Sequence, residues 1–148
     1  MITVDRLHAQ DHAAWGRLAA GYKAFYNTPT TKAEYDEAWR RLRAGDGVHA
    51  FGARLDGAGG GELVGIVHYL FHTSTWAPVQ CYLQDLYTDE ACRGRGVARA
   101  LIDGVAQAAR EAGATRLYWL TQETNHTARV LYDRVAQFKG FIRYEYPL

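Results

Sequence analysis

At Arg93-Gly94-Arg95-Gly96-Val97-Ala98 the sequence pattern changes from that of a strand to that of a helix, and this stretch decides the fold. Its two glycines leave the backbone bare where an apolar run, residues 81–88, leads into the helical pattern of residues 97–112. The first N–H groups of a helix have no partner inside it and carry the positive end of its dipole. Because arginines flank these groups, the turn is suited to holding a phosphate or a pyrophosphate.

The composition is that of an ordinary globular protein. Of 148 residues, 48% are hydrophobic and 22% charged, so we expect one domain over residues 1–148. A formal net charge of +1 gives no general attraction to nucleic acid or an anionic membrane, and neither partner is expected. No apolar run approaches the ~18 residues of a membrane span, and no signal-peptide pattern is evident. Cys81 and Cys92 lack metal-ligand spacing, so we expect no metal site and a reducing, cytoplasmic location.

Hydrophobic periodicity predicts an alternation of strands and helices. The predicted strands are residues 2–7, 48–55, 62–72, 81–88, 116–121 and 141–146. The predicted helices are residues 11–26, 31–45, 97–112 and 125–136. We expect Asp11 to cap the first helix, and Thr31, with Glu34 three residues later, to cap the second. Residues 56–61 have the composition of a hairpin turn. The order β-α-α-β-β-β-α-β-α-β implies an α/β sandwich with a mixed sheet.

Taken alone, the glycine turn has several explanations. It is not a P-loop, because no Gly-Lys-Ser/Thr follows the glycines, and Arg99 stands where a dinucleotide fingerprint needs its third glycine. A purely structural helix entry and a site for some other nucleotide both remain open.

Three further motifs stand in register with the turn. Leu83-Gln84-Asp85-Leu86-Tyr87-Thr88 precedes it, Asn125-His126-Thr127-Ala128-Arg129-Val130-Leu131-Tyr132 follows it, and Gly140-Phe141 comes last. The combination resembles the GNAT superfamily of acetyl-CoA-dependent N-acetyltransferases, and the strand and turn are most similar to the diamine acetyltransferase branch. The specific match covers residues 81–146.

The resemblance implies a fold and a co-substrate. The fold would be a three-layer sandwich whose mixed, mostly antiparallel sheet has splayed fourth and fifth strands, with acetyl-CoA in the gap. Leu86, Tyr87 and Thr88 would bind its pantetheine arm as an added strand would be bound. Asn125 would bond the same arm, unless it serves only as a helix N-cap.

The resemblance also gives the turn a specific role. The amides of Arg95, Gly96, Val97 and Ala98 would hold the pyrophosphate, and glycine at 94 and 96 lets it approach. Arg93 and Arg95 would add charge-assisted bonds, or would otherwise be solvated surface arginines.

Tyr132 is the catalytic acid that the resemblance implies. A phenol stays protonated at neutral pH and can protonate the departing CoA thiolate; the alternative is a core tyrosine on an amphipathic helix. For the base, Gln84 replaces the glutamate of a Glu-Asp pair, which leaves Asp85. Strict alternation puts Asp85 on an apolar face, so a bulge must re-aim it or bonds must satisfy it as a structural acid. Glu123 and His126 are further candidates.

Several other side chains have weaker claims. Glu34, Asp36 and Glu37 can attract a cationic amine or form a solvated helix face. His68 and His72 share a strand face, but nothing completes a metal site. The candidates for an aromatic acceptor pocket are Tyr22, Tyr26, Tyr35, Trp39 and Trp76.

We therefore expect an N-acetyltransferase that moves an acetyl group from acetyl-CoA to a primary amine by direct attack in a ternary complex. The acceptor would be small and polyamine-like or amino-acid-like. The alternatives are a protein lysine or N-terminal acetyltransferase and a non-catalytic CoA-binding sensor or scaffold. Pairing of residues 141–146 across an interface would give a homodimer.

Overall fold

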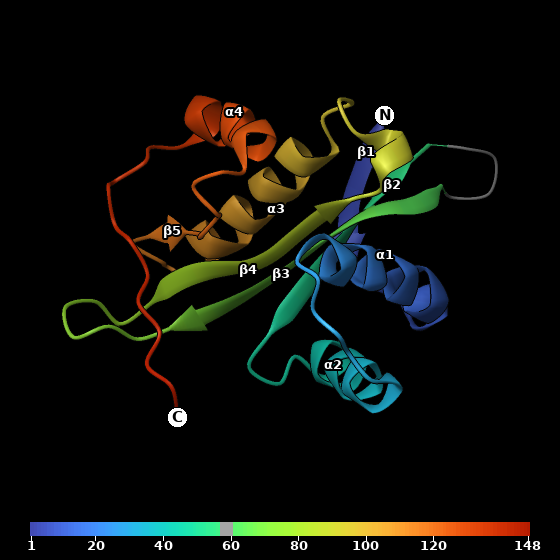
Figure 1. Ribbon diagram of the computed structural model, residues 1–148, viewed down its shortest axis with the longest axis horizontal. Coiled ribbons are helices and arrows are strands. Elements are labelled where there is room, and N and C mark those ends of the chain that lie inside the picture. The colour runs from blue at the N-terminus through green and yellow to red at the C-terminus, as the bar shows by residue number, and fades with distance from the viewer. Residues whose placement is uncertain (57–60) are drawn as a thin grey trace.

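The centre of the molecule is one five-stranded sheet in the order β1-β2-β3-β4-β5 (Figure 1). The computed structural model describes residues 1–56 and 61–148. The strands are β1 (Ile2–Arg6), β2 (His49–Leu55), β3 (Glu62–His72), β4 (Gln80–Thr88) and β5 (Leu117–Tyr118). Neighbours are antiparallel from β1 to β4, whereas β5 runs parallel to β4. The predicted mixed, mostly antiparallel sheet is confirmed.

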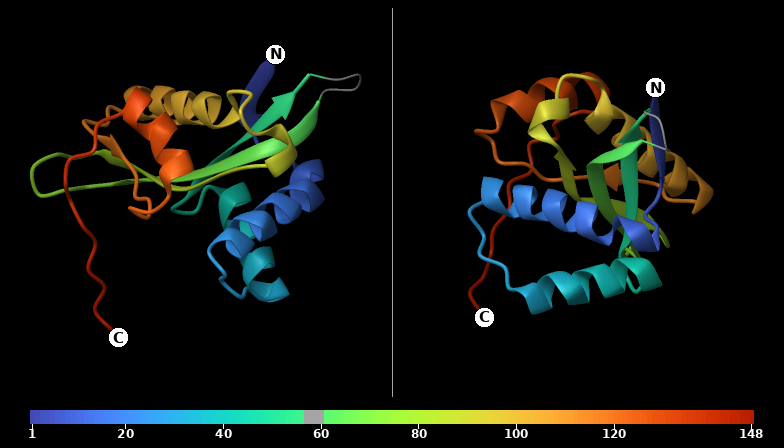
Figure 2. Two further views of the ribbon diagram at one scale, coloured as in Figure 1. Left: turned by 45° about the horizontal axis from the view of Figure 1, so that its top comes forward. Right: turned by 90° about the vertical axis from the view of Figure 1, so that its right-hand side faces the viewer.

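Helices cover both faces of this sheet (Figure 2). One face carries α1 (His12–Phe25) and α2 (Lys32–Ala44), and the other carries α3 (Val97–Glu111) and α4 (His126–Val135). Two short 3-10 turns, η1 (Ala9–Asp11) and η2 (Glu90–Cys92), precede α1 and α3. The predicted three-layer α/β sandwich is confirmed.

A separate hydrophobic core fills each helix–sheet interface. The apolar residues of α3 recur once per turn, so Val97, Leu101 and Val105 are almost wholly buried against the sheet. On the other face, Trp15 of α1 and Ile66 of β3 belong to the second core. The sheet therefore has two differently lined faces, and the face on which a β4 side chain lies decides which helices it meets.

One of the two predicted helix caps is confirmed. Thr31 and Glu34 form the reciprocal capping box of α2, with N–H to side-chain oxygen distances of 3.2 and 3.1 Å. The prediction for Asp11 is wrong, because η1 runs directly into α1 and gives Asp11 a helical backbone rather than the extended one that a cap needs. Its buried carboxylate instead accepts from the backbone N–H of His8 and pairs with Arg54, both at 2.6 Å.

A β-bulge in β4 changes the side on which its side chains lie. His68 of β3 pairs with Asp85, but the next residue, Tyr69, pairs with Leu83, so Gln84 is the extra residue. Without it, Leu83 and Asp85 would share a face. With it, Leu83 packs in the core under α3, while Asp85 turns toward α1 and α2.

The fourth and fifth strands are paired only at one end. β5 contacts β4 through Cys81 opposite Leu117 and Tyr82 opposite Tyr118. Beyond Tyr82 the described chain places no strand beside that edge of β4, which leaves the predicted splay. β5 is correspondingly shorter than the strand predicted over residues 116–121, because only two of those residues pair with β4.

The predicted C-terminal strand is wrong. Residues 136–148 contain no helix or strand and are exposed, and the segment hangs away from the helices in Figure 2. A strand needs a partner edge, and this segment finds none within the described chain. The predicted hairpin turn lies largely outside the described residues, at 57–60. Among the described residues, no helix combines the length and apolarity that crossing a bilayer demands.

Candidate active site

Two neighbouring cavities meet at Tyr22 of α1 and Tyr87 of β4, which line both. The long groove, of about 550 Å³, runs between the end of β4, the start of α3 and α4. The inner pocket, of about 250 Å³, lies between β3, β4, α1 and α2. The residues that line the groove include Leu86, Tyr87, Thr88, Arg93, Gly94, Gly96, Val97, Ala98, Asn125 and Tyr132. The residues that line the pocket include Trp15, Tyr22, Lys23, Glu34, Arg41, His68, Gln84 and Asp85.

The glycine turn forms one end of the groove. Gly94 and Gly96 have φ angles of +74° and +86°, in the left-handed region that side chains rarely adopt. A Cβ on Gly94 would meet nothing within 4 Å, so the glycine requirement there comes from backbone conformation rather than crowding. The turn delivers the unpaired N–H groups of the first turn of α3, Val97 and Ala98 among them, to the groove.

The two arginines of the turn behave differently. The Arg93 side chain donates from Nε to the backbone oxygen of Thr88 at 3.2 Å, and its guanidinium carbon lies 5.5 Å from the centre of the Tyr87 ring. Arg93 is thus held on the groove wall, while the exposed Arg95 is absent from the residues lining it.

The second half of β4 forms the groove wall. Leu86, Tyr87 and Thr88 line it just beyond the point where β4 and β5 separate. Thr88 is buried, and its Oγ1 has no hydrogen-bond partner within the described chain. A buried hydroxyl without a partner costs free energy, so this atom is suited to bonding a ligand in the groove.

α4 contributes Asn125 and Tyr132 to the opposite side. Asn125 is the N-cap residue of α4, but its side chain makes no capping bond and donates to Thr121 Oγ1 at 3.2 Å. The Tyr132 ring packs edge-on against Trp119 with 5.4 Å between centroids. Burial, helped by nearby Tyr26, raises the pKa of Tyr132 to about 12, so its hydroxyl keeps its proton throughout the neutral range.

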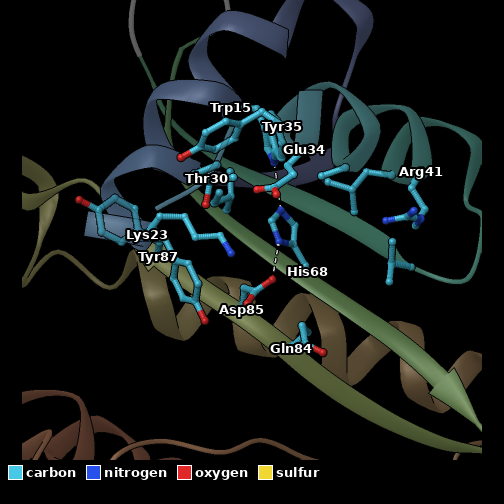
Figure 3. A pocket seen from close by; sticks show the side chains of 16 residues that line it. Trp15, Lys23, Thr30, Glu34, Tyr35, Arg41, His68, Gln84, Asp85 and Tyr87 are labelled. Carbon is cyan, nitrogen blue, oxygen red and sulfur yellow. Dashed lines mark hydrogen bonds and ion pairs between the residues drawn. The ribbon is translucent and has the colours of Figure 1, made fainter. Parts of the chain in front are cut away.

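Asp85 is the carboxylate of the inner pocket (Figure 3). Its Oδ2 lies 2.9 Å from Nδ1 of His68 on the neighbouring strand. Burial alone would raise the pKa of Asp85. The hydrogen bond from His68, a bond from Tyr22 and the charge of Lys23 outweigh burial and lower it. Asp85 is therefore ionised at neutral pH.

Other charged side chains surround the inner pocket. Glu34 of α2 adds a second carboxylate, and Lys23 and Arg41 add cationic groups. Arg41 bonds Glu37 at 3.1 Å, whereas Figure 3 shows Lys23 pointing toward the space in front of Asp85. The pocket therefore has the charges to hold a small molecule that bears both an ammonium and a carboxylate.

Several predicted candidates do not reach either cavity. Glu123 and His126 are exposed, and Trp76 is 93% exposed. Trp39 packs on Trp15 at 5.3 Å between centroids. Asp36 pairs with Lys32 at 2.6 Å. No group of metal-binding side chains occurs among residues 1–56 and 61–148, and His72 instead bonds the Tyr118 hydroxyl at 2.8 Å.

The sequence pattern does not predict the roles of three pocket residues. It indicates His68 only as a candidate metal ligand and gives no role to Trp15 or Lys23. Trp15 and Tyr22 are seven residues apart, two helical turns, which places them on one face of α1. This spacing is the sequence signal that places Trp15 on the same helix face as Tyr22. The pairing of His68 with Asp85 depends on the bulge, which the sequence pattern does not locate.

Known proteins resemble this chain over most of its length. Residues 15–138 match the model of the acetyltransferase (GNAT) family. The chain is 33% identical over 136 residues to a D-amino-acid N-acetyltransferase of Saccharomyces cerevisiae, covering 91% of this chain and 84% of that protein. It is 35% identical over 88 residues to a thialysine N-epsilon-acetyltransferase of Caenorhabditis elegans, covering 60% of this chain and 52% of that protein.

Solved structures share the fold. A ribosomal-protein-alanine N-acetyltransferase from Brucella melitensis superposes with a TM-score of 0.81 at 24% identity, covering 100% of both chains. The family match and the yeast relative extend over most of the sequence. The family match, over residues 15–138, includes every residue that lines the two cavities. The chain therefore belongs to the acetyltransferase (GNAT) family and is an acetyl-CoA-dependent N-acetyltransferase.

Proposed function

We propose that the protein, as one domain over residues 1–148, acetylates the primary amine of a small, amino-acid-like acceptor by direct attack in a ternary complex. The observation that carries this proposal is the meeting of the two cavities at Tyr22 and Tyr87, with Tyr132 on the groove side and Asp85 in the pocket. Two substrates bound in these cavities would meet at the junction, which favours direct transfer over a covalent enzyme intermediate.

The long groove has suitable donors for acetyl-CoA. The unpaired N–H groups at the start of α3 and the Arg93 side chain suit the pyrophosphate. The backbone of residues 86–88, the unpartnered Thr88 hydroxyl and the Asn125 amide suit the amide-bearing pantetheine arm. Acetyl-CoA supplies the acetyl group as a thioester, whose carbonyl carbon the amine attacks.

Asp85 and Tyr132 have complementary tasks in this transfer. Asp85, as a carboxylate, attracts the acceptor's ammonium into the pocket; the ammonium then loses one proton to solvent. A nitrogen–carbon bond forms as the carbon–sulfur bond breaks. Tyr132 donates its phenolic proton to the departing sulfur, and the second amine proton restores the phenol. The products are an amide, CoA thiol and one released proton.

The pocket charges favour an amino-acid-like acceptor over a simple polyamine. Asp85 and Glu34 can hold an ammonium, while Lys23 can hold a carboxylate, which a polyamine lacks. The activities named for the yeast and nematode relatives, on D-amino acids and on thialysine, support this choice. A pocket of about 250 Å³ suits a side chain or a free amino acid of modest size.

A thiol-release assay with acetyl-CoA and an amine panel tests the proposal. The panel comprises D- and L-amino acids, their amides, lysine analogues, diamines and lysine-containing peptides. We expect free amino acids to react faster than their amides, because only the former carry the carboxylate. Preference for peptides would favour the protein-acetylating alternative. Acetyl-CoA binding without thiol release from any amine of the panel would mean that the acceptor is not a small amino-acid-like amine.

We further propose a homodimer in the cytoplasm. The exposed C-terminal segment carries large apolar side chains: Phe138, Phe141, Ile142, Tyr144, Tyr146 and Leu148. A second copy of the chain would cover them. Cys81 and Cys92 are free thiols, which a reducing compartment maintains.

A further inference from the structure

Three side chains from three elements form one hydrogen-bonded chain at the base of the inner pocket. Trp15 Nε1 of α1 donates to His68 Nε2 of β3 at 3.0 Å. His68 Nδ1 lies 2.9 Å from Asp85 Oδ2 of β4. Trp15 is 2% exposed, and the His68 and Asp85 side chains are 13% and 25% exposed. These hydrogen bonds thus lead from the second core to Asp85, a partly buried carboxylate that lines the inner pocket.

The direction of these bonds fixes the protonation of His68. An indole nitrogen can only donate, so His68 Nε2 must accept and carries no hydrogen. The single proton of a neutral imidazole then lies on Nδ1, from which it is donated to Asp85. A protonated His68 would turn an N–H toward the N–H of Trp15 and lose that bond. Both ring nitrogens are occupied, so His68 cannot serve as the base itself.

We propose that Trp15 and His68 are positioning residues that hold Asp85 as an oriented carboxylate toward the acceptor's ammonium; this rests on the acceptor role proposed for Asp85. His68 engages Oδ2 of the Asp85 carboxylate, which lines the inner pocket. Asp85 follows the bulge at Gln84, where the strand does not by itself fix the side-chain direction. Holding His68 neutral also preserves the negative charge of the site, because an imidazolium would cancel that of Asp85.

The pH behaviour of the site depends on every charged or titratable group that faces Asp85. These are His68 of β3, Tyr22 and Lys23 of α1, Tyr26 directly after α1, Glu34 and Arg41 of α2, and Tyr82 and Tyr87 of β4. Burial and Asp85 raise the pKa values of Tyr22 and Tyr26, so neither phenol loses its proton at neutral pH. The hydrogen bond that His68 accepts from Trp15 would be lost if Nε2 took up a proton.

The first experiment measures the protonation of the two ring nitrogens of His68 directly and needs no substrate. Nitrogen-15 NMR of the whole protein, with the His68 signals assigned through a His68→Gln variant, identifies which ring nitrogen is protonated. We expect Nδ1 to be protonated and Nε2 bare at neutral pH. An imidazolium or an Nε2–H tautomer at neutral pH would overturn the proposal. Because this readout is independent of acetylation, it stands or falls separately from the proposed function.

The second experiment compares Trp15→Phe with Trp39→Phe. The two tryptophans pack on each other, but only Trp15 donates to His68. For each variant we divide its kcat/KM for the acceptor by that of the wild type at each pH, so that the titration of the acceptor cancels. We expect the ratio for Trp15→Phe to fall about tenfold as pH drops through the histidine range, because the released His68 becomes protonated. The ratio for Trp39→Phe should stay flat.

Trp15 is a core residue, so folding is checked by circular dichroism and by acetyl-CoA affinity before kinetics. A folded Trp15→Phe whose ratio is as flat as that of Trp39→Phe would contradict the positioning role. If Trp15→Phe does not fold, His68→Gln replaces it. Its amide can donate to Asp85 and accept from Trp15 with no titration, so its ratio should be flat with pH, and a pH-dependent ratio would count against the proposal.

Discussion

Gly21 of α1 lies directly against the Tyr87 ring of β4. A Cβ on Gly21 would come within 2.5 Å of the Tyr87 hydroxyl oxygen and 2.7 Å of its Cζ. Tyr87 is one of the two residues shared by the groove and the pocket, so the absence of a side chain at position 21 sets where the wall between the cavities stands.

Gly21→Ala should therefore displace Tyr87 and lower kcat/KM for the acceptor about tenfold, with a loss of about 1 kcal/mol in the free energy of unfolding. Gly16→Ala is the matched control on the same helix, because a Cβ there meets nothing within 4 Å. Gly16→Ala should keep full activity, and its free energy of unfolding should rise by up to about 1 kcal/mol, since alanine favours helix. Steady-state kinetics measure kcat/KM, and urea unfolding measures the free energy of unfolding. Equal kcat/KM and equal free energy of unfolding in the two variants would mean that the Tyr87 ring can move aside without cost.

Tyr132→Phe should lower kcat by about 10²-fold or more while leaving acetyl-CoA affinity nearly unchanged, because only the donated proton is lost. Tyr144→Phe, in the exposed C-terminal segment, is the control. The thiol-release rate gives kcat, and calorimetric titration gives the affinity. A Tyr132→Phe enzyme with wild-type kcat across the pH range would remove Tyr132 as the acid.

Asp85→Asn should raise the acceptor KM by about tenfold or more with the fold intact, because the amide keeps an acceptor oxygen for His68 but has no charge for the ammonium. The pKa of Asp85 is lowered in the folded state, so its ionisation stabilises the protein above the unfolded pKa near ~3.9. This stabilisation is lost as pH falls through the folded pKa.

The stability difference between wild type and Asp85→Asn should therefore shrink on acidification from neutral pH toward about pH 3. Thermal unfolding followed by circular dichroism at both pH values measures it. A variant that fails to fold even at neutral pH would favour the purely structural interpretation of Asp85.

Gly96→Ala and Gly113→Ala form another matched pair. Their φ angles are +86° and +76°, so each alanine should cost about 1–2 kcal/mol of folding free energy. Only Gly96 lines the long groove, and only Gly96→Ala should raise the KM for acetyl-CoA, because its turn presents the N–H groups of α3. A KM for acetyl-CoA that rises equally in both variants would show a general effect of lost stability.

Removal of residues 141–148 should convert the proposed dimer into a monomer, as measured by light scattering after size-exclusion chromatography. These residues form no helix or strand, so their removal should not lower the helix content seen by circular dichroism. A full-length chain that is monomeric at high concentration would exclude the dimer.

The sequence predicted most of the fold because its hydrophobic periods are strong. The pattern of residues 97–112 differs from α3 by one residue at its end, and the predicted strand at residues 62–72 coincides with β3. The predicted strand at residues 141–146 was wrong, since alternation signals a strand's side-chain pattern but not whether an edge is available to pair with.

The candidate site was only partly predictable for a related reason. Motifs in register identified the turn, Asn125 and Tyr132, which all line the groove. The link from Trp15 through His68 to Asp85 joins residues far apart in sequence, and its geometry depends on the register of β3 against β4. Local patterns do not encode such register, because it emerges when two strands and a helix pack together.

Because of the bulge in β4, one position of this strand borders the acceptor pocket without also having to pack in a hydrophobic core. Gln84 is exposed and stands outside the regular pleat, so neither hydrophobic core packs around it, yet it borders the inner pocket. A replacement at this position changes the acceptor's surroundings with little penalty to folding. Position 84 is thus a place where acceptor preference can diverge between related enzymes while Asp85 and the scaffold behind it stay in place.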